Sequence, residues 1–363
     1  MKTLRTLCLT MFLVFVLLPN QVFADVIDKF LIYSGPPGTR IHSYDVSDNI
    51  VVWSDNSANP DRDLPGTDIY GYNLSTGNKF TLCSALGEQT WPKISGNYVV
   101  WQDGRNLSYG YDIYGYLLGR GEHTVCTTPS SQTRPVVAKS TSGTTYAFFD
   151  DNKIAVMSSA TGYLPSYIYQ MKGSYSGVID MTYDTVVWWD SNVYRIYGYN
   201  LMEKKVFTIS TGNSVAIDGN TVVGSDYRDG KYIIFSYDLA APTGAIPMSI
   251  IRESNTPSYV LSPAISGDIV VWKEFTRLPG TWNICAYNLT TAEFFTIETS
   301  LLHPEGLYGQ AMSPPFIPAI DGNLVVWAEG NSLYGAIIPE PATLFLVLPA
   351  ALLLFRMRKR ETK

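Results

Sequence analysis

The chain has 363 residues, of which 46% are hydrophobic and 13% aromatic, and it carries 26 Lys and Arg against 32 Asp and Glu. A formal net charge of −6, without a basic patch of any length, excludes a nucleic-acid binder held by phosphate contacts. Short β-branched and aromatic runs, punctuated by Gly, Pro, Asn and Asp, predict an all-β body of one large domain or two ordinary ones.

The N-terminal segment, residues 1–24, has the pattern of a secretory signal peptide. Lys2 and Arg5 give a positive start, residues 7–18 form an apolar run, and Val22 and Ala24 occupy the positions that precede cleavage. As a helix the run would rise only about 18 Å, which is short of a hydrocarbon core of about 30 Å. We therefore expect this segment to be removed and the rest of the chain to be secreted.

A five-residue phrase, first seen as Val-Val-Trp-Ser-Asp, recurs through the body of the chain. Its third residue returns after 48, 48, 39, 36, 48 and 55 residues, close to the period of about 40–50 that is typical of a propeller blade. The copies are residues 51–55, 99–103, 147–151, 186–190, 222–226, 270–274 and 325–329.

Each repeat reads as four short strands joined by turns. A lead-in, such as residues 92–97, ends in a tight-turn dipeptide, and the Val-Val-Trp phrase follows it. An Ile-Tyr-Gly-Tyr strand and a Phe-Thr-Leu strand complete the unit, as at residues 69–72 and 80–82. Sheets that are apolar on both faces are covered when they stack radially, so the sequence predicts a seven-bladed β-propeller over residues 25–337.

Two further features of the repeats concern packing. Gly71, Gly115 and Gly198 stand inside strands, where they would let a neighbouring aromatic ring approach the backbone closely. The seventh unit lacks a fourth strand before the tail begins, whereas residues 30–33 form a spare strand ahead of the first lead-in. We predict that this spare strand completes the last blade and closes the ring.

The C-terminal segment, residues 338–363, has three parts in order. Pro339, Glu340 and Pro341 come first, residues 342–355 carry no charge, and a basic cluster follows. This cluster contains Arg356, Arg358, Lys359 and Arg360. Because Lys and Arg resist translocation, the segment is expected to act as a transmembrane stop-transfer helix with its basic end in the cytoplasm.

The tail resembles the PEP-CTERM sorting signal, in which Pro-Glu-Pro precedes a short hydrophobic helix and an Arg-rich end. That resemblance implies an exosortase-type membrane transpeptidase as partner, cleavage near the tripeptide, and a bacterial protein of the cell surface or exopolysaccharide. A plain membrane anchor without processing is the alternative. The repeats over residues 40–337 resemble the TolB-like β-propeller family, which implies the fold but leaves the function open.

An acidic residue ends every copy of the phrase. Those residues are Asp55, Asp103, Asp151, Asp190, Asp226, Glu274 and Glu329. They would form a cation-binding rim if they converged, but recurrence in each blade favours the capping of a turn. The loop after the first copy is long and rich in oxygen ligands, so Asp55, Asp61 and Asp63 are candidate calcium ligands. No other cofactor is expected.

Catalytic motifs are absent from the sequence. His42, His123 and His303 fall in different repeats, and no nucleophile elbow, zinc helix or phosphate loop occurs. Cys83, Cys126 and Cys285 remain after signal removal, and a bridge between the first two is conceivable. The leading hypothesis is a non-catalytic surface propeller that binds or scaffolds a polysaccharide or protein. The alternative is a carbohydrate-active lyase or hydrolase with a site in the central channel.

Overall fold

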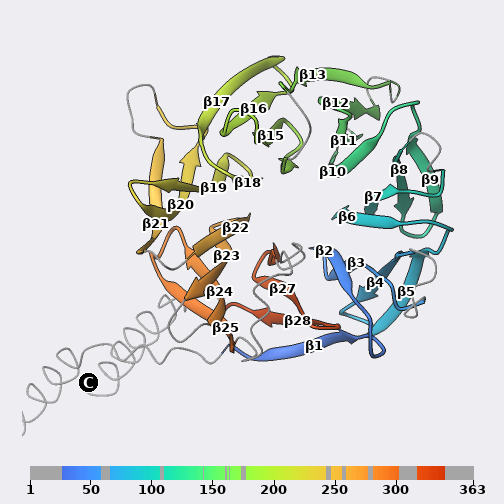
Figure 1. Ribbon diagram of the computed structural model, residues 1–363, viewed down its shortest axis with the longest axis horizontal. Helices are drawn as coiled ribbons and strands as arrows, with labels where there is room; N and C mark the ends of the chain where they lie inside the picture. Colours follow the sequence, from blue (N-terminus) through green and yellow to red (C-terminus); the bar gives the residue numbers. More distant parts are fainter. Residues whose placement is uncertain are drawn as a thin grey trace, which may run out of the picture. The chain divides into compact units, whose positions relative to one another are not determined.

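The computed structural model describes residues 27–339, with gaps at 59–65, 107–109, 142, 160–161, 163, 173–176, 243–246, 256–258, 277–280 and 302–316. Lys29–Ile338 form one compact unit. The described residues of this unit form 28 strands in seven four-stranded antiparallel sheets, arranged around a central axis (Figure 1). The all-β, seven-bladed propeller predicted from the repeats is confirmed.

Six blades consist of consecutive strands. Blade 1 contains β2 (Ile41–Ser47), β3 (Ile50–Asp55), β4 (Asp68–Asn73) and β5 (Asn78–Cys83). Blade 2 contains β6 (Gln89–Ser95), β7 (Tyr98–Asp103), β8 (Asp112–Leu117) and β9 (Gly121–Cys126). Blade 3 contains β10 (Gln132–Ser140), β11 (Gly143–Asp150), β12 (Lys153–Ser158) and β13 (Ser166–Gln170).

The remaining blades continue around the ring. Blade 4 contains β14 (Ile179–Met181), β15 (Thr185–Asp190), β16 (Arg195–Asn200) and β17 (Lys205–Thr211). Blade 5 contains β18 (Ser214–Asp218), β19 (Thr221–Arg228), β20 (Lys231–Asp238) and β21 (Met248–Asn255). Blade 6 contains β22 (Tyr259–Ser266), β23 (Ile269–Thr276), β24 (Thr281–Asn288) and β25 (Phe294–Leu301). Blade 7 contains β26 (Ala319–Asp321), β27 (Leu324–Glu329), β28 (Ser332–Ile337) and β1 (Lys29–Ser34).

The Val-Val-Trp phrase forms the second strand of its blade. Val51, Val52 and Trp53 have no exposed surface, because this strand has a neighbour on each side and a blade against each face. β-branched and aromatic residues suit such a strand. Truncation of a buried Trp to Ala would cost about 3–5 kcal/mol, so the phrase accounts for much of the stability of the blades that contain the Trp.

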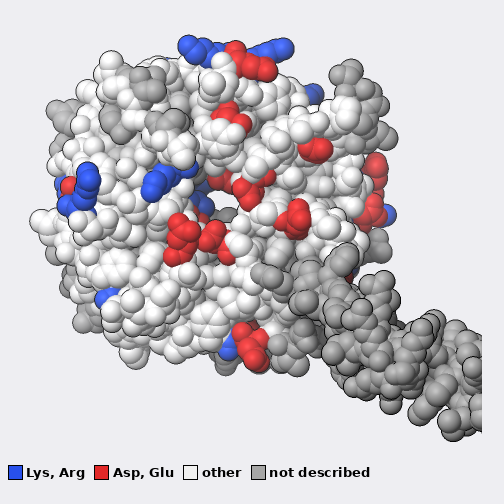
Figure 2. All heavy atoms as spheres, turned by 180° about the vertical axis from the view of Figure 1, so that it is seen from behind, with Lys and Arg blue, Asp and Glu red and all other residues white. Residues whose placement is uncertain are grey.

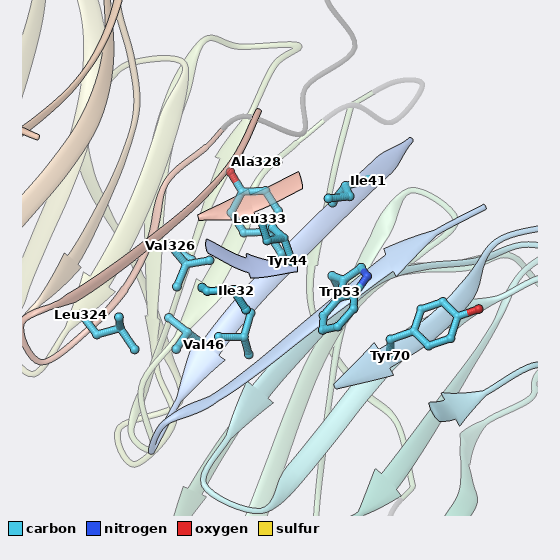
Figure 3. Packing of buried hydrophobic residues seen from close by; sticks show 12 residues of the cluster. Ile32, Ile41, Tyr44, Val46, Trp53, Tyr70, Leu324, Val326, Ala328 and Leu333 are labelled. Atoms are coloured by element: carbon cyan, nitrogen blue, oxygen red, sulfur yellow. The ribbon is translucent and has the colours of Figure 1, made fainter. Parts of the chain in front are cut away.

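The hydrophobic core is divided among the spaces between neighbouring blades. One cluster joins blade 7 to blade 1 and contains Ile32 of β1, Tyr44 of β2, Trp53 of β3 and Val326 of β27 (Figure 3). A similar cluster joins blades 3 and 4 through Phe149 and Trp188. No blade therefore has a core of its own, and each one depends on its neighbours.

The N-terminal strand closes the ring, as predicted from the spare strand at residues 30–33. β1 pairs antiparallel with β28, from Lys29 opposite Ala336 to Ser34 opposite Ser332. Blade 7 thereby gains an outer strand from the other end of the folded body. Figure 1 shows β1, in blue, along the outer edge of the red blade.

The predicted approach of aromatic rings to strand glycines is confirmed in blades 1 and 4. A Cβ atom built on Gly71 would lie 2.4 Å from the ring of Phe80, and one on Gly198 would lie 2.3 Å from the ring of Phe207. Gly335 has the same relation to Phe30 of β1, at 2.6 Å. At Gly115 the neighbour is His123, an imidazole in place of the benzene ring.

Candidate functional site

The acidic residue that ends the second strand is buried in most blades. Asp55, Asp103 and Asp190 have no exposed surface, and Asp226 and Glu274 are 1% and 6% exposed. In blades 1 and 2 the carboxylate accepts the indole N–H of the Trp two residues earlier, at 2.7 Å and 2.8 Å. It also accepts a backbone N–H from the following turn, that of Ser57 in blade 1 and of Arg105 in blade 2.

Several of these carboxylates also have a cation from their own surroundings. Arg105 pairs with Asp103 at 2.8 Å, and Arg252 pairs with Glu274 at 2.8 Å. Glu329, the exposed member of the series, pairs with Lys29 of β1 at 2.9 Å. Asp103 therefore holds its Trp, its turn and a cation together. The acids of most other blades make one or two of these contacts, which indicates a structural role for the recurring acid.

The structure corrects the sequence register in blade 3. The sequence predicts a copy at residues 147–151 that ends in Asp151. Strand pairing instead places Phe149 opposite Ile154 and Asp150 opposite Lys153, as Ser54 lies opposite Ile69 in blade 1 and Asp55 opposite Asp68. Asp150 is 3% exposed, so it is the buried acid of this blade, and Asp151 lies in the turn with a positive φ of 51°.

Of the three predicted calcium ligands, the structure describes only Asp55. Asp55 has both carboxylate oxygens engaged by Trp53 and Ser57, and it is fully buried. Asp61 and Asp63 lie outside the described residues. Among the residues that the structure describes, no group of three or more His, Cys, Asp or Glu side chains is placed to hold a metal ion.

A second set of polar side chains lies on the innermost strands, beside the channel. These residues accept backbone N–H groups from the next blade: Asp45 from Ile94 (3.0 Å), Ser47 from Gly96 (3.1 Å), Asp180 from Ile217 (2.9 Å), Asp218 from Gly267 (2.6 Å), Ser266 from Gly322 (2.9 Å) and Asp321 from Asp48 (2.7 Å). The last of these bonds crosses the seam between blades 7 and 1. A belt of side-chain to backbone bonds therefore links blades around the channel.

Three charged residues on these innermost strands occupy one register position. Asp45 lies opposite Val52, Lys93 opposite Val100, and Asp180 opposite Val187. In the other four blades the same position holds a small apolar residue, namely Val136, Ala216, Ala264 and Ala319. We call Asp45, Lys93 and Asp180 the channel triad. The fold does not require charge at this position, because four blades form without it.

The members of the channel triad influence one another across three blades. Lys93 Nζ lies 3.4 Å from Asp45 Oδ1. Burial lowers the pKa of Lys93, but the carboxylates of Asp45 and Asp180 outweigh it and raise that pKa above its ordinary value. Burial raises the pKa of Asp180 to about 6, against the lowering effect of Lys93 and the N–H groups of Ile217 and Met181.

Further carboxylates lie near Asp45 of the triad, namely Asp48, Asp218 and Asp321. Burial raises the pKa of Asp321, against the N–H of Asp48, and the charges of Asp48, Asp45 and Asp218 raise it further. Figure 2 shows Asp and Glu side chains gathered around the central opening on one face of the ring. The channel mouth is therefore a negatively charged surface with a lysine inside it, suited to a neutral or basic ligand.

Sequence reasoning missed the triad, although a signal was present. The repeats were recognised by residues that are alike in all blades. The triad residues differ instead from the Ala and Val that stand at the same register position in the other blades. Comparing the residue before the last hydrophobic residue of each lead-in would have found Asp45, Lys93 and Asp180.

The histidines and cysteines do not form a cluster in the part of the chain that is described. His42 lies on β2 and His123 on β9, and His303 falls outside the described residues. Cys83, Cys126 and Cys285 are buried free thiols, so the conceivable bridge between the first two is not formed. Cys83 packs between blades 1 and 2, whereas Cys126 packs between blades 2 and 3.

The folded body ends beside the predicted sorting motif. Ile338 is 1% exposed, its N–H donates to the carbonyl of Asn323, and Pro339 follows half-buried. Glu340, Pro341 and the predicted helix at 342–355 lie outside the described residues, as do the basic residues after it. Within the described ranges, no helix has the length and apolar character to cross a membrane.

No family model matches the chain, and no curated protein matches it at a significant level. An oligogalacturonate lyase in complex with manganese aligns over 86% of this chain and 96% of its own, with a TM-score of 0.60 and 12% identity. Virginiamycin B lyase from Staphylococcus aureus aligns over 86% of this chain and 99% of its own, with a TM-score of 0.55 and 14% identity. TolB from Acinetobacter baumannii aligns over 83% and 80%, with a TM-score of 0.44 and 11% identity. At these identities, the likeness to the two lyases shows the propeller fold and nothing finer.

Proposed function

We propose that this chain is an exported bacterial cell-surface β-propeller that binds a polysaccharide or protein at the channel mouth without converting it chemically. The observation that carries the proposal is the channel triad. Charge on an inner strand costs desolvation, and blades 3, 5, 6 and 7 avoid that cost with Val136, Ala216, Ala264 and Ala319. Charge retained in three blades that meet at the channel supports a ligand there.

The sign of the surface narrows the ligand class. Between the two predicted sorting segments the chain has 19 Lys and Arg against 30 Asp and Glu. The carboxylates of Asp45, Asp180 and Asp321 meet near the channel, where they repel polyanions and attract basic groups. A neutral polysaccharide or a basic protein segment therefore suits this face better than an acidic polysaccharide.

The proposal includes the route to the surface. The signal peptide at 1–24 and the Pro339, Glu340 and Pro341 motif support secretion and processing by an exosortase-type membrane transpeptidase. The helix at 342–355 would hold the chain in the membrane until that step. The intact mass of protein extracted from the cell surface tests this route: loss of residues 342–363 is expected, and their retention would leave a plain membrane anchor.

A carbohydrate-active enzyme is the second candidate, and one observation favours it. Asp180, with a pKa of about 6, and Lys93 are both titratable groups inside the channel, as general acid–base chemistry requires. The negative channel mouth argues against the anionic substrate that the name of the oligogalacturonate lyase implies for that protein. An enzyme of this kind would therefore act on a neutral substrate or have its site on another face of the ring.

One experiment separates binding from catalysis. The full-length chain is passed over immobilised neutral, acidic and basic polysaccharides and basic proteins, and the eluates are analysed for cleavage products. We expect retention without turnover, and retention should fall in Asp45→Asn and Asp180→Asn. Ala264→Ser changes the same register position without charge and serves as the control. Product formation that is lost in Asp180→Asn would establish an enzyme instead. Unchanged retention in all variants would show that the triad does not contribute to the binding site.

A further inference from the structure

Four blades share a Trp on the second strand that faces a Tyr on the third. The pairs are Trp53 with Tyr70, Trp101 with Tyr114, Trp188 with Tyr197, and Trp327 with Tyr334, in blades 1, 2, 4 and 7. In three of these blades a cation of the chain lies over the tyrosine ring. Lys79 lies 3.9 Å from the centroid of Tyr70, Arg105 3.9 Å from that of Tyr114, and Lys29 3.9 Å from that of Tyr334.

Blade 1 shows how this arrangement accommodates an ammonium group. Tyr33, from the outer strand of the preceding blade, adds a third ring 4.8 Å from Trp53. Lys79 Nζ lies 4.3 Å from the ring of Tyr33, 5.5 Å from that of Trp53 and 3.9 Å from that of Tyr70. The faces of these rings are electron-rich and attract the cation. Three aromatic side chains thus form a cage that a lysine occupies.

Blade 4 repeats the cage with the same residue types. Tyr169, from the outer strand of blade 3, lies 5.0 Å from Trp188, and Trp188 lies 5.8 Å from Tyr197. The corresponding distances in blade 1 are 4.8 Å and 5.8 Å. The position of the third ring is also conserved, because Tyr33 pairs with Leu333 and Tyr169 with Ile154 at equivalent points of their blades.

The blade 4 cage contains no cation among the residues that the structure describes. Lys79 of blade 1 pairs with Tyr72, and the equivalent partner of Tyr199 in blade 4 is Val206, which is 37% exposed. The two tyrosines instead lie against each other, with 5.3 Å between the centroids of Tyr169 and Tyr197. Trp188 itself is fully buried, whereas Tyr169 and Tyr197 are half-buried and Val206 is exposed.

Hydrogen bonding in the cage is incomplete in this state. Trp53 donates its indole N–H to Asp55, whereas the equivalent Trp188 Nε1 is buried without a partner. The carboxylate that would accept it, Asp190 Oδ2, accepts the hydroxyl of Tyr169 at 3.2 Å instead. A ligand between the rings that moves only the Tyr169 hydroxyl away from Asp190 would free that oxygen for Trp188, so an occupied cage would recover the bonding seen in blade 1.

One charge difference works against a cation. Asp68, opposite Asp55 in blade 1, is replaced in blade 4 by Arg195, opposite Asp190. Arg195 is exposed, and Lys204 and Lys205 are exposed nearby on the chain. Their repulsion is screened by solvent and salt, whereas the buried Asp190 beside the cage is screened less.

We propose that the cage of Tyr169, Trp188 and Tyr197, together with Asp190, is a binding site for an organic ammonium group. The ligand is an alkylated or primary amine whose cationic head takes the place that Lys79 takes in blade 1. This site lies between blades 3 and 4 and is separate from the channel triad, so it does not depend on the function proposed for the channel.

The test is a titration of the full-length chain with tetramethylammonium, followed by the NMR signals of the Tyr and Trp rings. The neutral analogue 3,3-dimethylbutan-1-ol is titrated in parallel. We expect the cation to bind roughly tenfold more tightly than the alcohol, as a partly desolvated cation–π contact predicts. Equal shifts with both compounds would overturn the proposal, because they would show only apolar binding.

Three variants make the test specific to the cage. Val206→Lys supplies the lysine of blade 1 and should abolish binding while the fold is kept. Arg195→Asp restores the acid of blade 1 and should tighten binding several-fold. Lys79→Met empties the blade 1 cage and should raise the number of bound cations from one to two. This variant leaves blade 4 unaltered, so its result does not depend on how a change in blade 4 affects the fold. Binding that is unchanged in Val206→Lys would place the cation elsewhere and refute the site.

Discussion

The ring contains two layers of carboxylates that differ in what surrounds them. The outer layer, represented by Asp103, is buried and is bonded to the Trp, the turn and the arginine of its own blade. The channel layer, represented by Asp45 and Asp180, bonds to the next blade through backbone N–H groups and lies beside Lys93 in the channel. The outer layer recurs in every blade, whereas the triad position is charged in three blades only.

This difference separates structural from functional charge. In Asp55 and Asp103 both carboxylate oxygens already accept bonds inside the blade, so neither has capacity left for a ligand. Asp190 is an exception in this layer, because the indole N–H of its own Trp188 does not bond to it. A charge that some blades replace with Ala or Val is not needed for the fold. Recurrence alone is therefore a poor guide to a binding site in a repeat protein, and departure from the repeat is a better one.

The largest effect should come from a change that breaks both layers at the seam. Deletion of residues 26–34 removes β1, and with it the partner of β28 and the Lys29 contacts to Glu329. The open ring also weakens the bond from Asp48 to Asp321. We expect the folded yield to fall greatly, as measured by secretion level and a thermal melt. A truncated protein with an unchanged melting temperature would contradict ring closure by β1.

The outer layer is tested next by Asp103→Ala. Loss of this buried carboxylate leaves the Trp101 indole and the Arg105 guanidinium without it, so the free energy of unfolding should fall by about 3–5 kcal/mol. Glu329→Ala removes the exposed member of the same series and should cost at most about 1 kcal/mol. Urea denaturation measures the free energy of unfolding of both variants. Equal decreases in the two variants would show that burial does not make Asp103 more important for stability than Glu329.

The channel layer should respond to pH through Asp180. Its pKa is raised to about 6 in the folded protein from 3.8, so the fold binds this proton more tightly than the unfolded chain does. Its stabilising contribution is present below about pH 4 and is lost as pH rises through about 6. Asp180→Asn should therefore be about 1–2 kcal/mol more stable than the native protein at pH 7.5 and equal to it at pH 4, allowing for screening. Denaturation midpoints at the two pH values check this. If stability depends on pH in the variant as it does in the native protein, Asp180 is not the source of that dependence.

The smallest effect is expected at the rim of the triad. Asp45→Asn keeps an oxygen that can accept the N–H of Ile94 but removes the charge beside Lys93, whose side chain is 40% exposed. The free energy of unfolding should change by less than about 1 kcal/mol, whereas ligand retention should fall. A large loss of stability would move Asp45 from the functional layer to the structural one.

Much of the fold could be predicted from the sequence because the blades repeat. The period of the Val-Val-Trp phrase predicted seven blades, and the missing fourth strand of the last repeat predicted closure by residues 30–33, both of which are confirmed. The register of blade 3 was wrong because two aromatic and two acidic residues stand side by side there. Spacing could not decide between Asp150 and Asp151, whereas strand pairing did.

The candidate sites were harder to predict, for a physical reason. The channel triad joins blades 1, 2 and 4, and the cage joins an outer strand of blade 3 to blade 4, so both depend on how blades pack against each other. A repeat pattern shows what each blade contains but not which side chains of two blades meet. Glu340 and Pro341 of the sorting motif lie outside the described residues, as do Asp61 and Asp63. The sorting role and the calcium site therefore stay predictions.

The β1–β28 pair also sets the order in which the molecule can be completed. Lys29 and Glu329, which bond across it, are 300 residues apart in the chain. At a synthesis rate of about 5–20 residues per second, β1 waits roughly 15–60 s for its partner strand to be made. During that time the strand has no sheet to join, and the edge of β28, once made, stays open until β1 reaches it. A second chain arriving in that interval competes for the same edge, so crowded synthesis would favour dimers that exchange β1 over closed single rings.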